Sequence, residues 1–440
     1  MTKSIILTLA ALLSMALPAG AQTEGWTLRE CIEYARENNI QVRQAQINKE
    51  NSDEDLLQAR AQALPSLSAS VGQNFSVSKM QEVPDGDYTL KGAYNGSYGL
   101  NSSVTLYNGG RIRDNLALAQ INNSAYALDI LDAQNDIEIS VVQAYLNILY
   151  AKESVTTAEN TLAASEAQRD RAKVMYDEGA ISLSEYAQLD AQYTSDNYSL
   201  VSSRNNLSQY ILNLKQLLEL GLETDFSVAF PDLDDNDVLQ IVPTVEQVYY
   251  TALEVMPDME SGRLDIEAAE LNEKIARASL LPSVSASASI GTANASGYGS
   301  DLFNQLNNKA NGGVGVTMSV PIFSNRSART SVAKARNSTR QTELSYQSAQ
   351  KNLLSTIETL HQDAVSAQSR YLAAKKKLES AELSFTLVNE KFNEGMVNAV
   401  DLLTEKNTYT AAQQELNQAK YQAILSLQLL KFYQDSPIEL

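Results

Sequence analysis

Few residues of this sequence have the types and spacing that chemistry requires, and the densest group is acidic. Asp232, Asp234, Asp235 and Asp237 lie within one short segment. Closely spaced carboxylates can ligate calcium, but the calcium-loop template also requires glycine at its sixth position and glutamate at its twelfth. Asp237 and Pro243 occupy those positions here. We therefore interpret the run as solvated loop charge and predict no metal site.

The other chemically versatile side chains occur singly. His361 is the only histidine and Cys31 the only cysteine, which nearly excludes histidine-based catalysis, histidine metal sites and an internal disulfide. The sequence shows no glycine-rich phosphate loop and no nucleophile elbow, so we predict neither an enzyme nor a cofactor. A formal net charge of −19 argues against nucleic acid as a partner.

Two segments place a carboxylate three residues after a residue that can cap a helix. Ser182-Leu-Ser-Glu185 has the form of a capping box, and Asn398-Ala-Val-Asp401 has a related form. An acidic side chain in the first turn also complements the helix dipole. Helix capping is therefore one role for Glu185 and Asp401, and any further role depends on the elements that carry them.

The N-terminal segment predicts secretion. Residues 1–21 combine Lys3, an apolar run and the small residues Ala19-Gly20-Ala21, as in a signal sequence, so the mature chain is expected to begin at Gln22. Beyond it, no apolar run approaches the about 18 residues that a membrane helix needs. If this chain enters a membrane, it does so as strands.

Four stretches alternate apolar residues with Ser, Asn, Gly or Thr, which is the period of a β-strand. They form two hairpins with polar connecting loops and lie at about residues 64–78, 93–107, 282–296 and 312–323. Each is close to the about 9–11 residues that a tilted strand needs to cross a bilayer. A soluble sandwich alternates in the same way, although its outer face would normally carry Lys and Glu.

Most of the remaining chain is predicted to be long helix, at about residues 111–220 and 326–433. Each region opens with a proline-free stretch of roughly 65 residues, near 100 Å of continuous helix, and continues in a shorter helix. The shorter helices carry heptad repeats, which indicate coiled-coil-like packing. The heptad residues are Tyr186, Tyr193, Leu200, Leu207 and Leu214 in the first, and Leu402, Tyr409, Leu416, Ala423 and Leu430 in the second.

The two halves of the chain correspond at a nearly constant offset. Tyr176 and Phe392 precede similar Glu-Gly turns and are 216 residues apart (392 − 176), as are Tyr193 and Tyr409 (409 − 193). Such self-similarity indicates a tandem repeat. We predict a first repeat at 22–222, an acidic linker at 223–243 and a second repeat at 244–440.

This ordered set of elements resembles the TolC-type outer-membrane efflux proteins over essentially the whole mature chain. The residues that carry the likeness open the strands, lead from strands into long helices, and form the helix-to-helix turns. They are Ala63-Leu-Pro-Ser66, Leu281-Pro-Ser283, Leu106-Tyr-Asn-Gly-Gly-Arg111, Pro321-Ile-Phe-Ser324, Glu178-Gly179 and Glu394-Gly395.

The resemblance implies a mainly helical protein with membrane β-structure. A homotrimer would pool four strands per chain into one twelve-stranded transmembrane β-barrel, continued by a long periplasmic α-helical barrel. The apolar side of each strand would face outer-membrane lipid and the serine side would line the pore.

The implied function is that of a passive exit duct of a tripartite efflux or type I secretion system. An inner-membrane pump of the RND or ABC type would supply substrate through a periplasmic adaptor protein. The alternative is a periplasmic coiled-coil scaffold or adaptor with a small soluble β-domain.

The resemblance also implies a constriction near the helix-to-helix turns, where the family carries a ring of aspartates. Asp401 matches that ring, and Glu185 is its first-repeat counterpart (401 − 185 = 216). Thr404 replaces a second acid, and Val397 stands where well-known members have an arginine. Three copies of Asp401 near one axis would repel one another, raise the pKa of each other's carboxyl groups and favour cations.

Adaptor contact is expected at the turns themselves. The candidates are Glu178 and Gly179 in the first repeat and Glu394 and Gly395 in the second. Glycine permits a tight turn, and a simple glycine cap at the end of a helix is the alternative role for Gly179 and Gly395.

Overall fold

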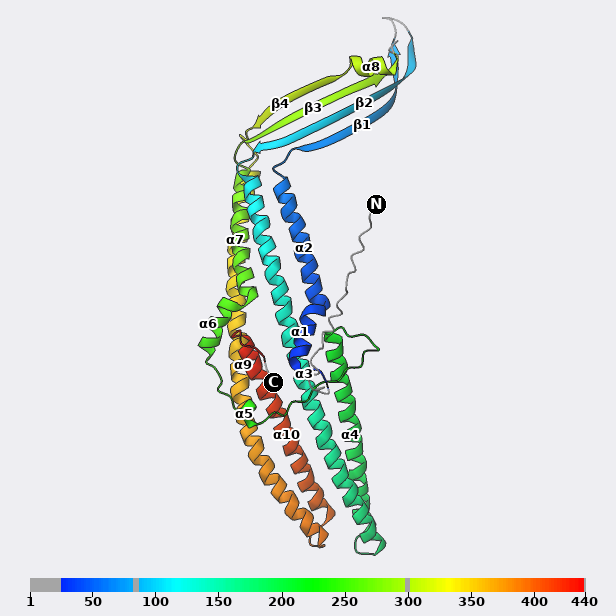
Figure 1. Ribbon diagram of the computed structural model, residues 1–440, viewed down its shortest axis with the longest axis vertical. Coiled ribbons are helices and arrows are strands. Elements are labelled where there is room, and N and C mark those ends of the chain that lie inside the picture. Colours follow the sequence, from blue (N-terminus) through cyan, green and yellow to red (C-terminus); the bar gives the residue numbers. More distant parts are fainter. Residues whose placement is uncertain (1–24, 82–86, 297–300, 439–440) are drawn as a thin grey trace, which may run out of the picture. The chain divides into compact units, whose positions relative to one another are not determined.

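The computed structural model describes residues 25–81, 87–296 and 301–438 (Figure 1). The predicted signal sequence lies outside these residues. The chain divides into two compact units, which we call the helical unit and the sheet-bearing unit. The helical unit comprises the residues up to Ile40, Asn135–Val248 and Ile357–Leu440, and the sheet-bearing unit comprises Gln41–Gln134 and Tyr249–Thr356.

The sheet-bearing unit contains one antiparallel sheet with the strand order β1-β2-β3-β4. The four predicted strands are therefore confirmed. Their bounds are β1 Ser66–Gln81, β2 Tyr88–Tyr107, β3 Ser283–Ala295 and β4 Asn311–Ser319. The helices of this unit are α2 (Ile40–Ala61), most of α6 (Val245–Val255), α7 (Pro257–Ala278) and the short α8 (Leu302–Asn308).

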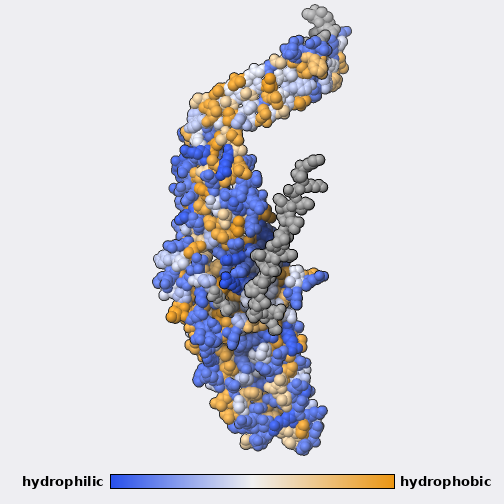
Figure 2. Space-filling view, viewed as in Figure 1, coloured by the Kyte–Doolittle hydropathy of each residue, from blue (hydrophilic) through white to orange (hydrophobic). Residues whose placement is uncertain are grey.

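The strand register gives the sheet one apolar and one polar face. Ala69 pairs with Leu100, which pairs with Ile290, so apolar side chains follow one another across neighbouring strands. The alternate rung joins Ser66 to Ser103 and then to Ser287, and the hydroxyl groups of Ser66 and Ser103 lie 3.0 Å apart. We call these the apolar face and the serine face. Hydrophobic side chains are visible along the sheet in the space-filling view (Figure 2).

The structure differs from the sequence prediction at ends of the strands and in one connection. β4 ends at Ser319 rather than near 323, because Pro321 has no N–H to donate to a ladder. β2 begins at Tyr88 rather than near 93, since Tyr88 pairs with Gln81 across the hairpin. The connection between β3 and β4, predicted as a loop, contains α8, whose first turn is capped by the Asp301 side chain.

The helical unit is built from paired long helices. Its elements are α1 (Leu28–Asn38), α4 (Leu183–Leu217), α5 (Asp235–Val238) and α10 (Ala399–Phe432), together with the later parts of α3 (Arg111–Asp177) and α9 (Ser327–Asn393), which contribute residues to both units. All ten predicted heptad residues of α4 and α10 are buried or half-buried, as coiled-coil-like packing requires.

The acidic linker is more ordered than solvated loop charge, so that interpretation needs correction. Asp234 caps α5, because its Oδ1 atom accepts a hydrogen bond of 2.7 Å from the N–H of Asn236. Asp235 accepts a hydrogen bond of 2.5 Å from the Tyr371 hydroxyl and pairs with Lys375. These carboxylates therefore fasten the linker to α9. Within the described ranges, no group of three potential metal ligands comes together.

Candidate constriction site

The predicted turn glycines both adopt backbone conformations that favour glycine. Gly179 has a φ of 75° and Gly395 a φ of 70°, while a Cβ added to either would meet nothing within 4 Å. The N–H of Ala180 donates to the Met175 carbonyl at 2.8 Å, and that of Met396 donates to the Lys391 carbonyl at 2.9 Å. These bonds end α3 and α9 in Schellman motifs. Backbone angle, and not lack of space, therefore accounts for each glycine.

Glu185 is engaged in the cap of its own helix. The Ser182 hydroxyl accepts from the N–H of Glu185 at 3.2 Å, and the Glu185 carboxylate accepts from the N–H of Ser182 at 2.9 Å. This reciprocal pair is the predicted capping box. The backbone hydrogen bond from Ser182 lowers the pKa of the Glu185 carboxyl group, so it remains an anion at neutral pH.

Asp401 has the same position in α10 but a freer carboxylate. Asn398 Oδ1 accepts from the N–H of Asp401 at 3.0 Å, which caps the helix. In the part of the chain that the structure describes, the Asp401 carboxylate itself has no hydrogen-bond or ion-pair partner, and the residue is exposed. The Thr404 hydroxyl donates to the Val400 carbonyl at 2.8 Å. Of the predicted constriction residues Glu185, Asp401 and Thr404, Asp401 therefore has the carboxylate that is most accessible to an ion.

A small hydrophobic core holds the two turns together. It is built from residues of all four helices that meet here, so the two helical hairpins pack against one another beside their turns. Val397 packs against this core. A valine side chain carries no charge, so it cannot make the arginine contact that the resemblance implies for this position. The fully buried residues are Ala172, Leu189, Phe392, Ala399 and Leu402.

Two polar contacts that sequence reasoning missed also join the hairpins. The Arg171 guanidinium donates to the Asn393 carbonyl at 3.0 Å, which satisfies a free carbonyl at the end of α9. Lys406 of α10 forms a buried ion pair with Asp196 of α4. The sequence does contain a signal for this pair. Lys406 lies four residues after the heptad residue Leu402, and Asp196 lies three residues after the heptad residue Tyr193. Residues three or four apart share a helix face, so each charge is expected on the face that packs against neighbouring helices.

The residue that packs against a matched tyrosine differs between the two repeats. In the first, the Arg169 guanidinium lies over the Tyr193 ring, 4.0 Å from its centroid. In the second, the corresponding Phe385 stacks on Tyr409 with ring centroids 5.5 Å apart. The same packing position is therefore filled by a cation in one repeat and by an aromatic ring in the other, which makes the two hairpins chemically unequal.

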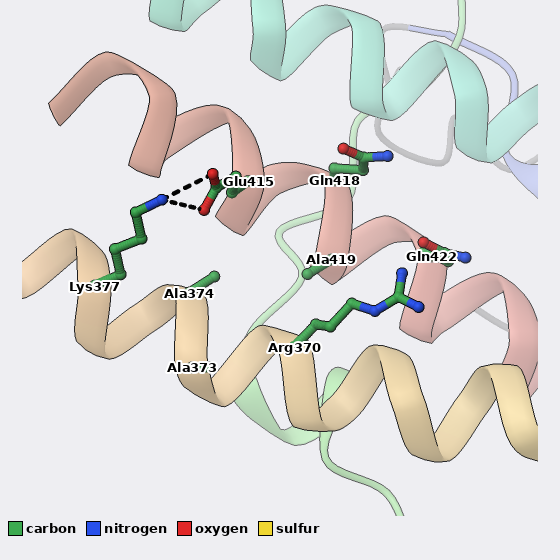
Figure 3. Close-up of a pocket in the computed structure, with 8 residues that line it drawn as sticks. All are labelled: Arg370, Ala373, Ala374, Lys377, Glu415, Gln418, Ala419 and Gln422. Atoms are coloured by element: carbon green, nitrogen blue, oxygen red, sulfur yellow. Dashed lines mark hydrogen bonds and ion pairs between the residues drawn. The ribbon is translucent and has the colours of Figure 1, made fainter. Parts of the chain in front are cut away.

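A groove of about 330 Å³ lies between α9 and α10 (Figure 3). Small side chains form its base, namely Ala373, Ala374 and Ala419. Lys377 Nζ lies 2.7 Å from the Glu415 carboxylate at one end of the groove, and the two side chains point toward one another (Figure 3). None of the predicted constriction residues lines this groove.

Comparison with known proteins identifies the class to which this arrangement belongs. The family model described as outer membrane efflux protein matches residues 31–219 and again residues 248–433. The chain therefore belongs to the outer membrane efflux protein family. The two matches also show that it contains two repeats of the family's unit.

Curated relatives and solved structures agree with this assignment. The chain is 22% identical over 419 residues to outer membrane efflux protein BepC of Brucella suis, covering 95% of this chain and 87% of the relative. It is 22% identical to outer membrane protein TolC of Escherichia coli over 424 residues, covering 91% and 80%.

Two crystal structures show a similar fold. That of CusC gives a TM-score of 0.77 at 19% identity and covers 92% of this chain and 91% of that one. That of the CmeC outer membrane channel of Campylobacter jejuni gives 0.75 at 20% identity, covering 92% and 85%.

The protein is an outer membrane efflux channel of the TolC, CusC and CmeC type, and it extends into the periplasm. It is a channel and not an enzyme. The alternative of a soluble coiled-coil scaffold is therefore wrong. Within the described residues, no helix is both long and apolar enough to cross a membrane.

Proposed function

We propose that three copies of this chain pool their strands into one twelve-stranded barrel (3 × 4). TolC-family channels form trimers, and the four-stranded sheet leaves β1 and β4 as open edges. Lipid cannot satisfy the free backbone groups of such edges, whereas β4 of one chain paired with β1 of the next removes them. This requirement is the observation that best supports the trimer.

The two faces of the sheet support one orientation of that barrel. Exposed apolar side chains such as Val71 (72%), Ile290 (61%) and Val316 (67%) belong on the lipid side. The serine face, with Ser66, Ser103 and Ser287 in register, then lines the lumen. A barrel of twelve strands is wide enough to enclose water, so uncharged hydroxyl groups can pass diverse solutes without binding them strongly.

The channel would act as a passive duct in a tripartite efflux or type I secretion system. An inner-membrane pump of the RND or ABC type would drive export, and a periplasmic adaptor would connect pump and channel. The turns at Glu178-Gly179 and Glu394-Gly395 are exposed and present an open surface around each glycine, which supports them as adaptor contacts.

Asp401 is the best candidate for charge selection in the constriction. Its carboxylate is exposed and unbonded within the described chain, whereas that of Glu185 is held by Ser182. Threefold symmetry would bring three Asp401 carboxylates around one axis. Such a ring favours cations over anions in the pore.

Planar-bilayer recording of the purified protein tests the duct directly. A passive pore is expected to give stepwise single-channel currents when neither nucleotide nor a pump protein is present. A protein that inserts as a trimer but conducts no current, even after the chain has been cleaved at the turns that contain Gly179 and Gly395, would contradict this function.

A further inference from the structure

Helix α8 is fastened to the apolar face of the sheet. The Thr292 hydroxyl, on the rung that joins Val71, Tyr98 and Thr292, donates to the Leu306 carbonyl at 2.5 Å. Gln305 is 8% exposed, and its side-chain oxygen accepts from the N–H of Ala295 at 2.8 Å. These two contacts hold α8 against β3 instead of leaving it as part of a free loop.

A cleft of about 610 Å³ separates α8 from the sheet, which is within the usual size of ligand pockets. No side chain that lines it carries a charge at neutral pH, so the cleft has no counter-ion for a charged ligand. Apart from Asn307, its larger lining side chains are hydrophobic or aromatic. They are Val71, Tyr98, Leu100, Ile290, Phe303 and Leu306.

Among the polar side chains that line the cleft, the hydroxyl groups of Tyr98 and Thr292 are already paired within the protein. Gln73 Nε2 donates to the Tyr98 hydroxyl oxygen at 2.7 Å, and Thr292 donates to α8 as described above. A hydrocarbon in the cleft would leave both hydrogen bonds intact. The chemistry of the walls therefore suits an apolar chain, because an uncompensated buried polar group would otherwise oppose it.

The mouth of the cleft continues into exposed apolar surface. Phe303, which lines the cleft with Val71 and Ile290, is 80% exposed, and the preceding residue on α8, Leu302, is 48% exposed. Removal of each side chain from water would lower the free energy in proportion to the apolar area buried. The protein resides in the outer membrane, so the surroundings of this face can supply hydrocarbon.

We propose that the cleft between α8 and the apolar face binds one acyl chain of a membrane lipid per subunit. The proposal rests on the orientation given under the proposed function, in which the apolar face meets lipid. The site is more specific than that orientation, because non-specific contact between an apolar face and lipid requires no defined cleft. Phe303 and Leu306 would cover the chain from α8, while Leu100 and Ile290 would support it from the sheet.

Tryptophan fluorescence tests this site in the full-length protein. Trp26 is the only tryptophan, so the variant Trp26→Phe with Phe303→Trp reports from α8 alone. A brominated fatty acid is titrated into this protein in detergent, because bromine quenches a tryptophan that it contacts. Saturable quenching is expected. Adding Ala69→Phe, which fills the cleft, should raise the half-saturating concentration about tenfold or more.

Ala288→Phe is the matched control, since Ala288 lies on the same face but does not line the cleft. It should leave the saturation curve unchanged. Quenching that rises without saturation, or that responds equally to both alanine substitutions, would show simple partitioning and overturn the site. The absence of quenching would overturn it as well.

Two further reporters separate this failure from failure of the proposed orientation. In vesicles of brominated phosphatidylcholine, tryptophan replacing Val316 on the apolar face should be quenched strongly, and tryptophan replacing Ser287 on the serine face weakly. If Val316→Trp is strongly quenched in the vesicles but the tryptophan on α8 shows no saturable quenching by the fatty acid, only the acyl-chain site is wrong. If Ser287→Trp is quenched more strongly, the orientation is wrong and the site falls with it.

Discussion

Lys406 and Asp196 form an ion pair between α10 and α4, and their side chains are only 2% and 10% exposed. They join the two helical hairpins of one subunit close to the turns that carry the candidate constriction. Burying two charges is costly, and the cost is offset only while both partners remain in place. The hairpins are therefore coupled by a contact that tolerates the loss of neither side chain alone.

The loss of one charge of this pair should cost more stability than the loss of both. Lys406→Met should destabilise the helical unit by about 3–5 kcal/mol, because it leaves the Asp196 carboxylate buried without a counter-charge, with only the Gln192 amide donating to it. The double variant Lys406→Met with Asp196→Leu should recover most of the loss. Thermal unfolding of the purified channel in detergent measures both. Equal destabilisation by the single and double variants would show that the charges are not coupled.

The turn glycines should be sensitive to any side chain. Gly395→Ala places an L-residue at a φ of 70°, which costs roughly 1–2 kcal/mol. Gly313→Ala is the matched control, because a Cβ there also meets nothing within 4 Å but the backbone angle is ordinary. The unfolding temperature should fall for Gly395→Ala only. A similar fall in both variants would mean that the turn conformation is not the cause.

Glu185 predicts a pH dependence of stability. Its pKa is lowered in the folded state by the hydrogen bonds from Ser182. The carboxylate therefore stabilises the fold fully above the unfolded pKa of about 4.3, and this contribution is lost as the pH falls through the lower folded pKa. The unfolding temperatures of the wild type and Glu185→Gln should differ at pH 7 and converge as the pH is lowered below both pKa values of the carboxyl group. A constant difference across that range would contradict the capping role.

Asp401 should affect ion selectivity more than stability. Asp401→Asn keeps the backbone N–H that Asn398 caps but removes the charge from the constriction. The cation-to-anion permeability ratio, obtained from reversal potentials in a salt gradient, should decrease by severalfold. Glu185→Gln should change the ratio less, since that carboxylate is held in its own cap. An unchanged ratio in Asp401→Asn would remove Asp401 from the pore.

Cys31 is expected to be chemically silent. Its side chain is fully buried in the helical unit, and burial raises the pKa of the thiol to about 12. At pH 8 almost no thiolate is present, and thiolate is the reactive form. Maleimide should label the denatured protein quantitatively and the folded channel at a rate lower by at least about 100-fold. Rapid labelling of the folded channel would show that α1 opens locally.

The sheet was predictable because its signal is local. Alternation with period two identifies a strand and both of its faces without knowledge of a partner. The observed register places Ala69, Leu100 and Ile290, apolar residues of three predicted strands, on one face. The repeats were predictable for a similar reason, since a constant sequence offset does not depend on geometry.

Other features depend on contacts that no local pattern contains. The helical-face positions of Lys406 and Asp196 indicate that each charge points toward a neighbouring helix, but the two residues are 210 positions apart in the sequence, so no local pattern identifies them as partners. Helix α8 is short and rich in asparagine, and its position is set by the contacts of Gln305 and Leu306 with β3. The acidic linker was misjudged because Tyr371 and Lys375, which bind Asp235, lie far along the chain on α9.

Native mass spectrometry of the mature protein, extracted from outer membranes in detergent, would show whether three chains share one barrel. We expect a trimer that survives removal of the detergent micelle, because pairing of β4 with β1 of the next chain leaves no free edge. A stable monomer that remains in solution without detergent would contradict the shared barrel and with it the proposed duct.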